Sequence, residues 1–530
     1  MKRVLIVNCY FDDSHQPLHR SRKIPHAMAP VFLAGALNRD ESEVRLFDEV
    51  TGGPLAADAV AGLDMLVLTG LTNAFDRMLH LTAYARTKNP NVVVVAGGPA
   101  VRALPLLARR FFDYVCQGDV EELRDVVTDA FGQQFAAEVM TPRYDLAHWT
   151  GRFGYIETSR YCNFRCSFCA LTAEGRRYRT YALDDIHRQL AAMGRKRLLM
   201  LLDNNFYGND RRDFLARVEL LRSMRDAGHF ELWAALVTND FFLDDDNLRH
   251  VRDAGCRCLF SGVESFDTRW LQSRNKTQNI VVPQVDLIRR CLEAGIVFSY
   301  GWIADVSSRS LVDLRRELEF ITDTPDITLP AFATLAIPLL GTPFFRDCVA
   351  RKLFLPKTKL RDVDGTTLVL KPLDPLEDAV GFVRDLQSLR GYRWRMLRHS
   401  AGFLRRYARH LSPLQMQVAL ANAALLATPA LATASLGGRR LAARRPPRTH
   451  VTTTEPLDDV YVPACRVDFR YRLYFQPTMI TDAAGELTPA VVDSGALDST
   501  GRDRRSPRPL AATPRSAVYQ EPVAVAVTAL

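Results

Sequence analysis

Short apolar runs alternate with amphipathic stretches over roughly the first 135 residues of the chain. The runs are rich in β-branched residues and are too short for buried helices, so each predicts a buried strand. They lie at 4–7, 44–49, 65–71, 92–98 and 113–118. Stretches with helical spacing separate them, at 28–38, 76–88, 101–111 and 119–131. Apolar strands joined by helices predict a doubly wound parallel sheet, with its ligand at the carboxyl ends of the strands.

The same alternation restarts after a proline-containing connector at 141–149. Strands are predicted at 155–159, 198–204, 232–238, 258–264, 296–303 and 327–336. Six βα units predict a partial or complete barrel of the TIM type, in which the chemistry gathers at the carboxyl ends of the strands. Asp203, Asn204, Thr238 and Glu264 stand at such ends.

The last third of the chain changes character. Residues 375–411 are predicted to be helical, and 413–438 are rich in Ala and Leu but interrupted by polar residues and a proline. A membrane span needs about 20 cleaner apolar residues, so we expect 413–438 to pack on the body or to lie on a membrane surface. Beyond 439 the Arg-, Pro- and Ser-rich composition predicts disorder, with the aromatic stretch 460–480 as a docked arm.

Four domains are therefore predicted: a doubly wound domain at 1–140, a barrel at 150–345, a helical domain at 346–438 and a basic tail at 439–530. The 530 residues exceed one core, and 47% hydrophobic with 24% charged residues is ordinary for a globular protein. The apolar run at the start is too short for a signal peptide, so a cytoplasmic location is expected. The stretches 439–448 and 502–515 carry the whole net charge of +9, which argues against a nucleic-acid-binding face.

The stretch "SRYCNFRCSFCAL" places Cys162, Cys166 and Cys169 in a CxxxCxxC spacing. The other seven of the ten cysteines are spaced irregularly, which does not indicate a disulfide framework. A structural zinc site needs four ligands, usually in two separated pairs, and no second pair lies nearby. Cys256 and Cys258 lie on one strand face and are expected to pack. Three thiolates suit an iron–sulfur cube with one iron open to a small molecule, and a zinc site or buried free thiols are the alternative.

In its context the triple resembles the signature of the radical S-adenosylmethionine (SAM) superfamily. "IETSRYCNFRCSFCA" follows a strand and "GRRYRTYALDDI" leads into a helix, and the resemblance covers about 155–345. It implies that the three cysteines hold a 4Fe–4S cluster and that SAM binds the unique iron. An electron, from a donor such as flavodoxin or ferredoxin, then cleaves SAM to a 5′-deoxyadenosyl radical. Phe168, before the last cysteine, is typical of the family.

Further segments extend the resemblance. "LLDNNFYGN" is similar to a family segment near the SAM amino group, and "FSGVES" to one whose acidic or amide side chain reaches the SAM ribose. The resemblance thus implies Glu264 as a SAM contact, with Asn204 and Thr238 as weaker candidates. The alternative is that Asp203 and Asn204 cap the following helix. "IPLLGTPFF" resembles the loop that closes the last barrel strand.

The amino-terminal domain resembles that of the cobalamin-binding subfamily, through "MLVLTGLTNAFDRMLHLTAYARTKNPNVVVVAGGPA" and "FFDYVCQGDVEE". This implies cobalamin-dependent methylation of an unactivated carbon in a small or lipid-like substrate. The chain departs from the subfamily in three places. It lacks the DxHxxG motif, and Ala100 replaces the usual histidine after the paired glycines. It also has "GDVE", with Asp119 and Glu121, where the subfamily has "GEGE". The candidate cobalamin neighbours are Thr69, Gly70, Leu71, Thr72, Gly97, Gly98 and Gly118.

Several alternatives stay open. Without cobalamin, hydrogen abstraction would lead to rearrangement, cyclisation or oxidation, and the first domain would only cover the barrel. A second alternative is a tRNA-modifying enzyme such as a methylthiotransferase. Those enzymes have a different layout, with three further cysteines before the triple, where this chain has only Cys9 and Cys116. A non-enzymatic iron–sulfur protein has little need of an open iron. His15, His19 and His26 are surface residues or cover the cofactor.

Overall fold

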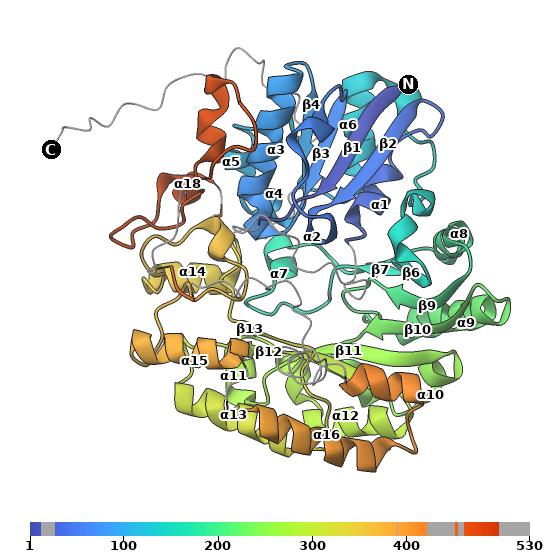
Figure 1. Ribbon diagram of the computed structural model, residues 1–530. Helices are drawn as coiled ribbons and strands as arrows, with labels where there is room; N and C mark the ends of the chain where they lie inside the picture. Colours follow the sequence, from blue (N-terminus) through green and yellow to red (C-terminus); the bar gives the residue numbers. More distant parts are fainter. Residues whose placement is uncertain (12–26, 389–390, 421–450, 454–460, 495, 498–530) are drawn as a thin grey trace, which may run out of the picture.

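The computed structural model describes residues 1–11, 27–388, 391–420, 451–453, 461–494 and 496–497. Two separate parallel sheets organise these residues, and their carboxyl edges lie on either side of the short helix α7 (Ala170–Glu174) (Figure 1). The predicted combination of a doubly wound sheet with a partial barrel is therefore confirmed.

The first sheet has the strand order β2-β1-β3-β4-β5, and all its pairs are parallel. Its strands are β1 (Lys2–Asn8), β2 (Ser42–Asp48), β3 (Met65–Thr69), β4 (Val93–Ala96) and β5 (Tyr114–Val115). In β1 the alternating side chains divide between two cores, because Val4 and Ile6 pack under one helix layer and Leu5 and Val7 under the other.

Helices cover both faces of this sheet. One layer holds α1 (Ala29–Ala34) and α6 (Glu122–Phe131), and the other holds α3 (Phe75–Lys88), α4 (Pro99–Ala103) and α5 (Pro105–Ala108). The short helix α2 (Glu49–Gly52) follows β2. The order 2-1-3-4-5 has its switch point between β1 and β3, where sheets of this type bind ligands.

The second sheet runs in chain order and is open, with β6 and β13 at its edges. Its strands are β6 (Phe153–Ile156), β9 (Lys196–Leu201), β10 (Phe230–Leu236), β11 (Cys256–Glu264), β12 (Val297–Ala304) and β13 (Phe332–Leu335). The helices connecting the strands are α8 (Leu183–Met193), α9 (Arg211–Asp226), α10 (Asp246–Asp253), α11 (Thr268–Ser273), α12 (Gln284–Glu293) and α13 (Leu311–Asp323). Two short antiparallel strands, β7 (Ser159–Arg160) and β8 (Arg179–Thr180), enclose the cysteine loop and α7.

The remaining helices belong to the C-terminal third. They are α14 (Pro343–Ala350), α15 (Leu376–Ser388), α16 (Arg393–Tyr407) and α18 (Pro489–Val492), and residues 413–420 are also helical. α16 packs on α13. Among the described residues no helix is both long and apolar enough to cross a membrane.

Part of the predicted tail lies against the first sheet. The ring of Tyr461 stacks on His80 of α3 with centroids 3.9 Å apart, and Phe475 stacks on the same imidazole at 4.9 Å. Tyr461 also accepts a hydrogen bond from Arg77 at 3.1 Å. The predicted tail residues 439–450, 454–460, 495 and 498–530 lie outside the described ranges.

Ion pairs join the first sheet to the barrel beside the cysteine loop. Glu121, in the loop after β5, accepts from Arg160 of β7 at 2.7 Å. Asp119 of the same loop pairs with Arg179 of β8 at 3.0 Å and accepts from the hydroxyl of Tyr161. Burial by itself raises the pKa of Asp119, but the Tyr161 hydrogen bond and the Arg160 charge outweigh it, so the pKa lies below its usual range.

Two further contacts complete this junction. Arg102 of α4 pairs with Glu174 of α7 at 2.6 Å and donates to the carbonyl of Gly118 at 3.0 Å. Arg176 donates to the carbonyl of Gln117 at 3.2 Å. The "GDVE" loop therefore contacts the hairpin directly and is linked to α7 through Arg102.

We expect Asp119→Asn to lower the free energy of unfolding by about 2 kcal/mol at neutral pH, because it removes a buried charge from charged partners. A lowered folded-state pKa stabilises the fold above the usual carboxyl pKa, and the stabilisation is lost as the pH falls through the folded value. The difference between variant and wild type should therefore shrink in acid. Urea unfolding across a pH series measures it, and the exposed Glu43→Gln is the control. An equal loss of stability in both variants would contradict a stabilising role of the Asp119 contacts with Arg160, Arg179 and Tyr161.

Candidate functional site

The cysteine loop lies between β7 and α7, at the carboxyl edge of the barrel. Tyr161 begins it with a φ of 65°, which turns the chain sharply before Cys162. The amide of Cys169 donates to the carbonyl of Cys166 at 3.2 Å, and Thr172 donates its hydroxyl to the same carbonyl at 2.8 Å. The CxxxCxxC spacing thus folds into a tight loop that gathers its three thiols beside the first sheet.

The three thiols are close enough to influence each other's charge. Burial raises the pKa of Cys162 to about 11, with a smaller decrease from the amide of Phe164 and smaller increases from Cys169 and Cys166. Burial likewise raises the pKa of Cys169. Thiols of this kind become thiolates when a metal replaces their protons.

The three thiols of this loop are the candidate donor set for a metal centre. Within the described ranges, no three His, Cys, Asp or Glu side chains gather where one metal ion could sit. A tetrahedral zinc site would need its ligands around one point, whereas each thiolate of an iron–sulfur cube binds its own iron. The assignment of the three cysteines to a 4Fe–4S cluster therefore stays a prediction, with the zinc site as its alternative.

The segment 274–278, which follows α11, packs against this loop. The carbonyl of Arg274 accepts from the amide of Ser167 at 2.9 Å, and Gln278 donates its side-chain amide to the sulfur of Cys166 at 3.3 Å. Gln278 is 3% exposed. The sequence analysis missed the segment 274–278 because "RNKTQ" carries no motif and reads as an ordinary polar turn.

Lys276 brings a buried positive charge to the same place. Its ammonium pairs with the carboxylate of Glu264 at 3.1 Å and lies 5.6 Å from the ring centroid of Phe168. Burial by itself lowers the pKa of Lys276, but the charges of Glu264 and Cys166 outweigh it and raise the pKa. A Cβ on Gly262 would lie 2.9 Å from the ammonium, so this position favours a residue without a side chain.

Glu264 reaches this pair through unusual backbone. Its φ is 61°, and the pairing of β11 with β12 shifts register between Ser261 and Glu264. Left-handed backbone at a non-glycine residue is uncommon and is concentrated at functional sites. The residue predicted to contact SAM therefore lies at the carboxyl end of β11, with one carboxylate oxygen bound by Lys276, whose charge also interacts with Cys166.

The weaker SAM candidates lie at neighbouring strand ends. Asn204 is exposed after β9, and the hydroxyl of Thr238, after β10, donates to the carboxylate of Asp240. The alternative capping role is wrong, because Asp210 caps α9. Asp203 is buried and accepts from the backbone amide of Thr158 at 2.7 Å, so it joins β9 to the end of β6.

All the candidate cobalamin neighbours lie at the carboxyl edge of the first sheet. Thr69 and Thr72 are buried, whereas Leu71 between them is 69% exposed. A Cβ on Gly70 would lie 2.8 Å from the carbonyl oxygen of Cys9, and Gly98 has a φ of 89°. Gly97 and Gly118 lie at the same edge, in the loops that follow β4 and β5. Close packing of the β1, β3 and β4 loops therefore accounts for part of this glycine pattern.

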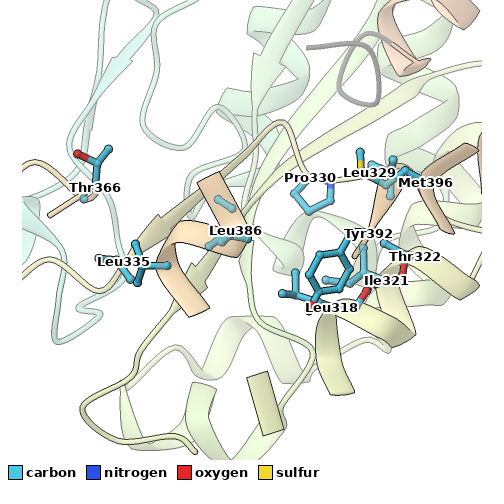
Figure 2. Close-up of a pocket in the computed structure, with 13 residues that line it drawn as sticks. Leu318, Ile321, Thr322, Leu329, Pro330, Leu335, Thr366, Leu386, Tyr392 and Met396 are labelled. Atoms are coloured by element: carbon cyan, nitrogen blue, oxygen red, sulfur yellow. Dashed lines mark hydrogen bonds between the residues drawn. The ribbon is translucent and has the colours of Figure 1, made fainter. Parts of the chain in front are cut away.

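Two other apolar features lie in and around the barrel. Phe260 of β11 stacks on Phe332 of β13 with centroids 5.8 Å apart, and Phe332 is 46% exposed. Since Leu259 and Val263 of β11 belong to the outer core, Phe260 faces the concave side of the open barrel, which is therefore apolar. An apolar cavity is lined by residues of α13, β13, α15 and α16, among them Leu318, Leu386 and Met396 (Figure 2).

Comparison with known proteins connects this geometry to a family. Residues 156–303 match the model of the radical SAM superfamily. An uncharacterized methyltransferase of Pyrococcus horikoshii is 23% identical over 375 residues, which are 62% of this chain and 80% of the relative. The hopanoid C-2 methylase of Rhodopseudomonas palustris is 26% identical over 347 residues, 61% of each chain.

Solved structures share the two-sheet arrangement. The cobalamin-dependent radical SAM enzyme OxsB, with aqua-cobalamin and SAM bound, has a TM-score of 0.55 at 16% identity, covering 81% of this chain and 75% of that chain. TsrM of Kitasatospora setae, a radical SAM methyltransferase with cobalamin and a [4Fe–4S] cluster bound, has a TM-score of 0.52 at 17% identity, covering 70% and 83%. At these identities the likeness concerns the fold alone. The matched residues run from the end of β6 through the cysteine loop to β12, so this segment of the barrel is similar to the radical SAM superfamily.

Proposed function

We propose that this protein cleaves SAM reductively at a 4Fe–4S cluster held by Cys162, Cys166 and Cys169, and that it methylates an unactivated carbon with the help of cobalamin. The observation that carries the proposal is the position of the cysteine loop, between the carboxyl edges of two parallel sheets (Figure 1). The relatives named as methyltransferases and the fold shared with cobalamin-binding enzymes support it.

When bound, the cluster and SAM supply a 5′-deoxyadenosyl radical that abstracts hydrogen, and cobalamin supplies a methyl group. The chain's own residues position and shield the reactants. Lys276 binds one oxygen of Glu264 and leaves the other to accept from a ligand hydroxyl. The buried ammonium also offsets negative charge close to the cysteine loop.

The concave face of the barrel supports an apolar substrate. Phe260 and Phe332 line it, Gly301 leaves room beneath the Phe332 ring, and Leu202 is 36% exposed after β9. Such a surface excludes water from a reacting radical and gains free energy by covering hydrocarbon. We therefore propose a small or lipid-like substrate, with an electron donor such as flavodoxin or ferredoxin.

Replacing the three cysteines tests the central claim. Cys162→Ala, Cys166→Ala and Cys169→Ala should each lose bound iron and sulfide after anaerobic reconstitution and form no 5′-deoxyadenosine from SAM under reduction. Each change removes one thiolate from a set that has no spare ligand. Cys465→Ala, on the arm at 461–494, is the matched control. Retained 5′-deoxyadenosine formation in these three single variants would refute the proposal.

Gln278 should tune the electron transfer. Hydrogen bonds to cluster sulfurs are one determinant of the reduction potential, because they stabilise the more negative reduced state. Gln278→Leu removes the donor to Cys166, so the midpoint potential should become more negative while iron content stays at the wild-type value. A redox titration followed by electron paramagnetic resonance measures this. Gln272→Leu, on α11, is the control, and an unchanged potential in Gln278→Leu would contradict the assignment.

Corrinoid binding separates the leading proposal from chemistry without cobalamin. Protein purified and reconstituted anaerobically with a corrinoid should retain it, and Leu71→Asp should weaken retention without loss of iron. Leu71 is 69% exposed at the switch-point edge, and a carboxylate there disfavours an apolar contact. Leu106→Asp, on α5, is the control. A clean absence of corrinoid in wild type would favour rearrangement, cyclisation or oxidation, with the first sheet as a cover.

A further inference from the structure

Helix α16 carries apolar side chains on both of its opposite faces. Its buried face packs on the barrel through Met396, His399, Phe403 and Tyr407. Surface helices normally present charged or polar residues on the other side. Here the spacing i, i+3, i+7 and i+10 from residue 394 instead places an outer stripe there, which consists of Trp394, Leu397, Ala401 and Leu404.

The outer stripe is open to solvent. Trp394 is 81% exposed, Leu397 50% and Leu404 45%. Isolated exposed apolar residues need no explanation, but a contiguous stripe on one helix marks an interaction surface. The next described segment, 413–420, also exposes Leu414 and Val418 and has no charged residue.

Arginines border the outer stripe and have no acidic partner among the residues that the structure describes. Arg398, Arg405 and Arg409 are exposed, and no ion pair joins any of them to a described residue. The arginines on the inner flank of α16 behave differently. Arg395 pairs with Asp323 at 2.6 Å and Arg406 with Asp326 at 2.7 Å, and both acids lie at or just beyond the end of α13.

This division of charge is informative. The inner arginines fasten α16 to the barrel, and the outer ones leave uncompensated positive charge beside exposed Trp and Leu. A helix with Trp and Leu on one face, flanked by basic residues, lies in the interface of an anionic membrane. The indole is at home at the headgroup level, and guanidinium groups pair with lipid phosphates.

The position of α16 favours a membrane over a redox protein. α16 lies on the far side of the barrel from α7, which follows the last cysteine (Figure 1). A donor protein bound there would be separated from the cysteine loop by the barrel sheet. We propose that the outer stripe, with Arg398, Arg405 and Arg409, docks this protein on the surface of an anionic lipid bilayer.

Vesicle sedimentation with the full chain tests this proposal. Wild type should bind vesicles of phosphatidylcholine with phosphatidylglycerol, should bind phosphatidylcholine alone at least about tenfold more weakly, and should be released by salt. Trp394→Ser/Leu397→Ser and Arg398→Glu/Arg405→Glu should each weaken binding to the anionic vesicles by about tenfold or more. The matched control is Leu243→Ser/Arg110→Glu, which alters an apolar and a basic residue that are also exposed but lie elsewhere.

Tryptophan fluorescence gives a second readout. Trp394 is far more exposed than Trp233, Trp270 and Trp302, which are at most 4% exposed. Its emission should shift to the blue on anionic vesicles, and Trp394→Phe should abolish the shift. Unchanged melting temperatures will show that the variants fold. Absence of vesicle binding, binding unaffected by both double variants, or binding only to an acidic protein would each overturn the proposal.

Discussion

The contact between the loop after β5 and the β7–β8 hairpin is the interaction on which the rest of the structure depends. It sets two carboxylates, Asp119 and Glu121, against Arg160, Arg179 and the hydroxyl of Tyr161. Arg160 and Asp119 are largely removed from water, which is costly for a charge without a partner, so their ion pairs favour one relative position of the two sheets. That position brings the switch-point edge of the first sheet over the cysteine loop.

The same contact gives a role to the sequence "GDVE", which this chain has in place of "GEGE". "GDVE" retains two acids, and both are used to bind the hairpin that carries the cysteines. Tyr161, the residue before Cys162, receives its orientation from Asp119. The geometry of the candidate cluster loop is therefore coupled to the neighbouring domain and not only to the barrel.

Within the barrel, a second charged pair occupies the space beside the thiols. Lys276 and Glu264 come from the turn after α11 and the end of β11, and each satisfies the other in a buried position. The left-handed backbone at Glu264 and the missing side chain at Gly262 make room for this pair. Such backbone strain persists when the surrounding packing enforces it. Here segment 274–278, which contains Lys276, is held against the cysteine loop by hydrogen bonds.

Much of the fold could be predicted from local pattern. Apolar runs of strand length, amphipathic stretches and the CxxxCxxC spacing are properties of neighbouring residues, so the sequence by itself determined two parallel sheets, their strands and a three-cysteine loop. Only the tertiary structure decided which side chains surround that loop. Gln278 meets Cys166 across 112 positions, and Tyr461 meets Arg77 across 384. No periodicity records such contacts, because they arise from the packing of whole elements. The outer face of α16 follows the same rule, since the sequence predicted helix at 375–411 and only burial of the opposite face left Trp394 and Leu397 in solvent.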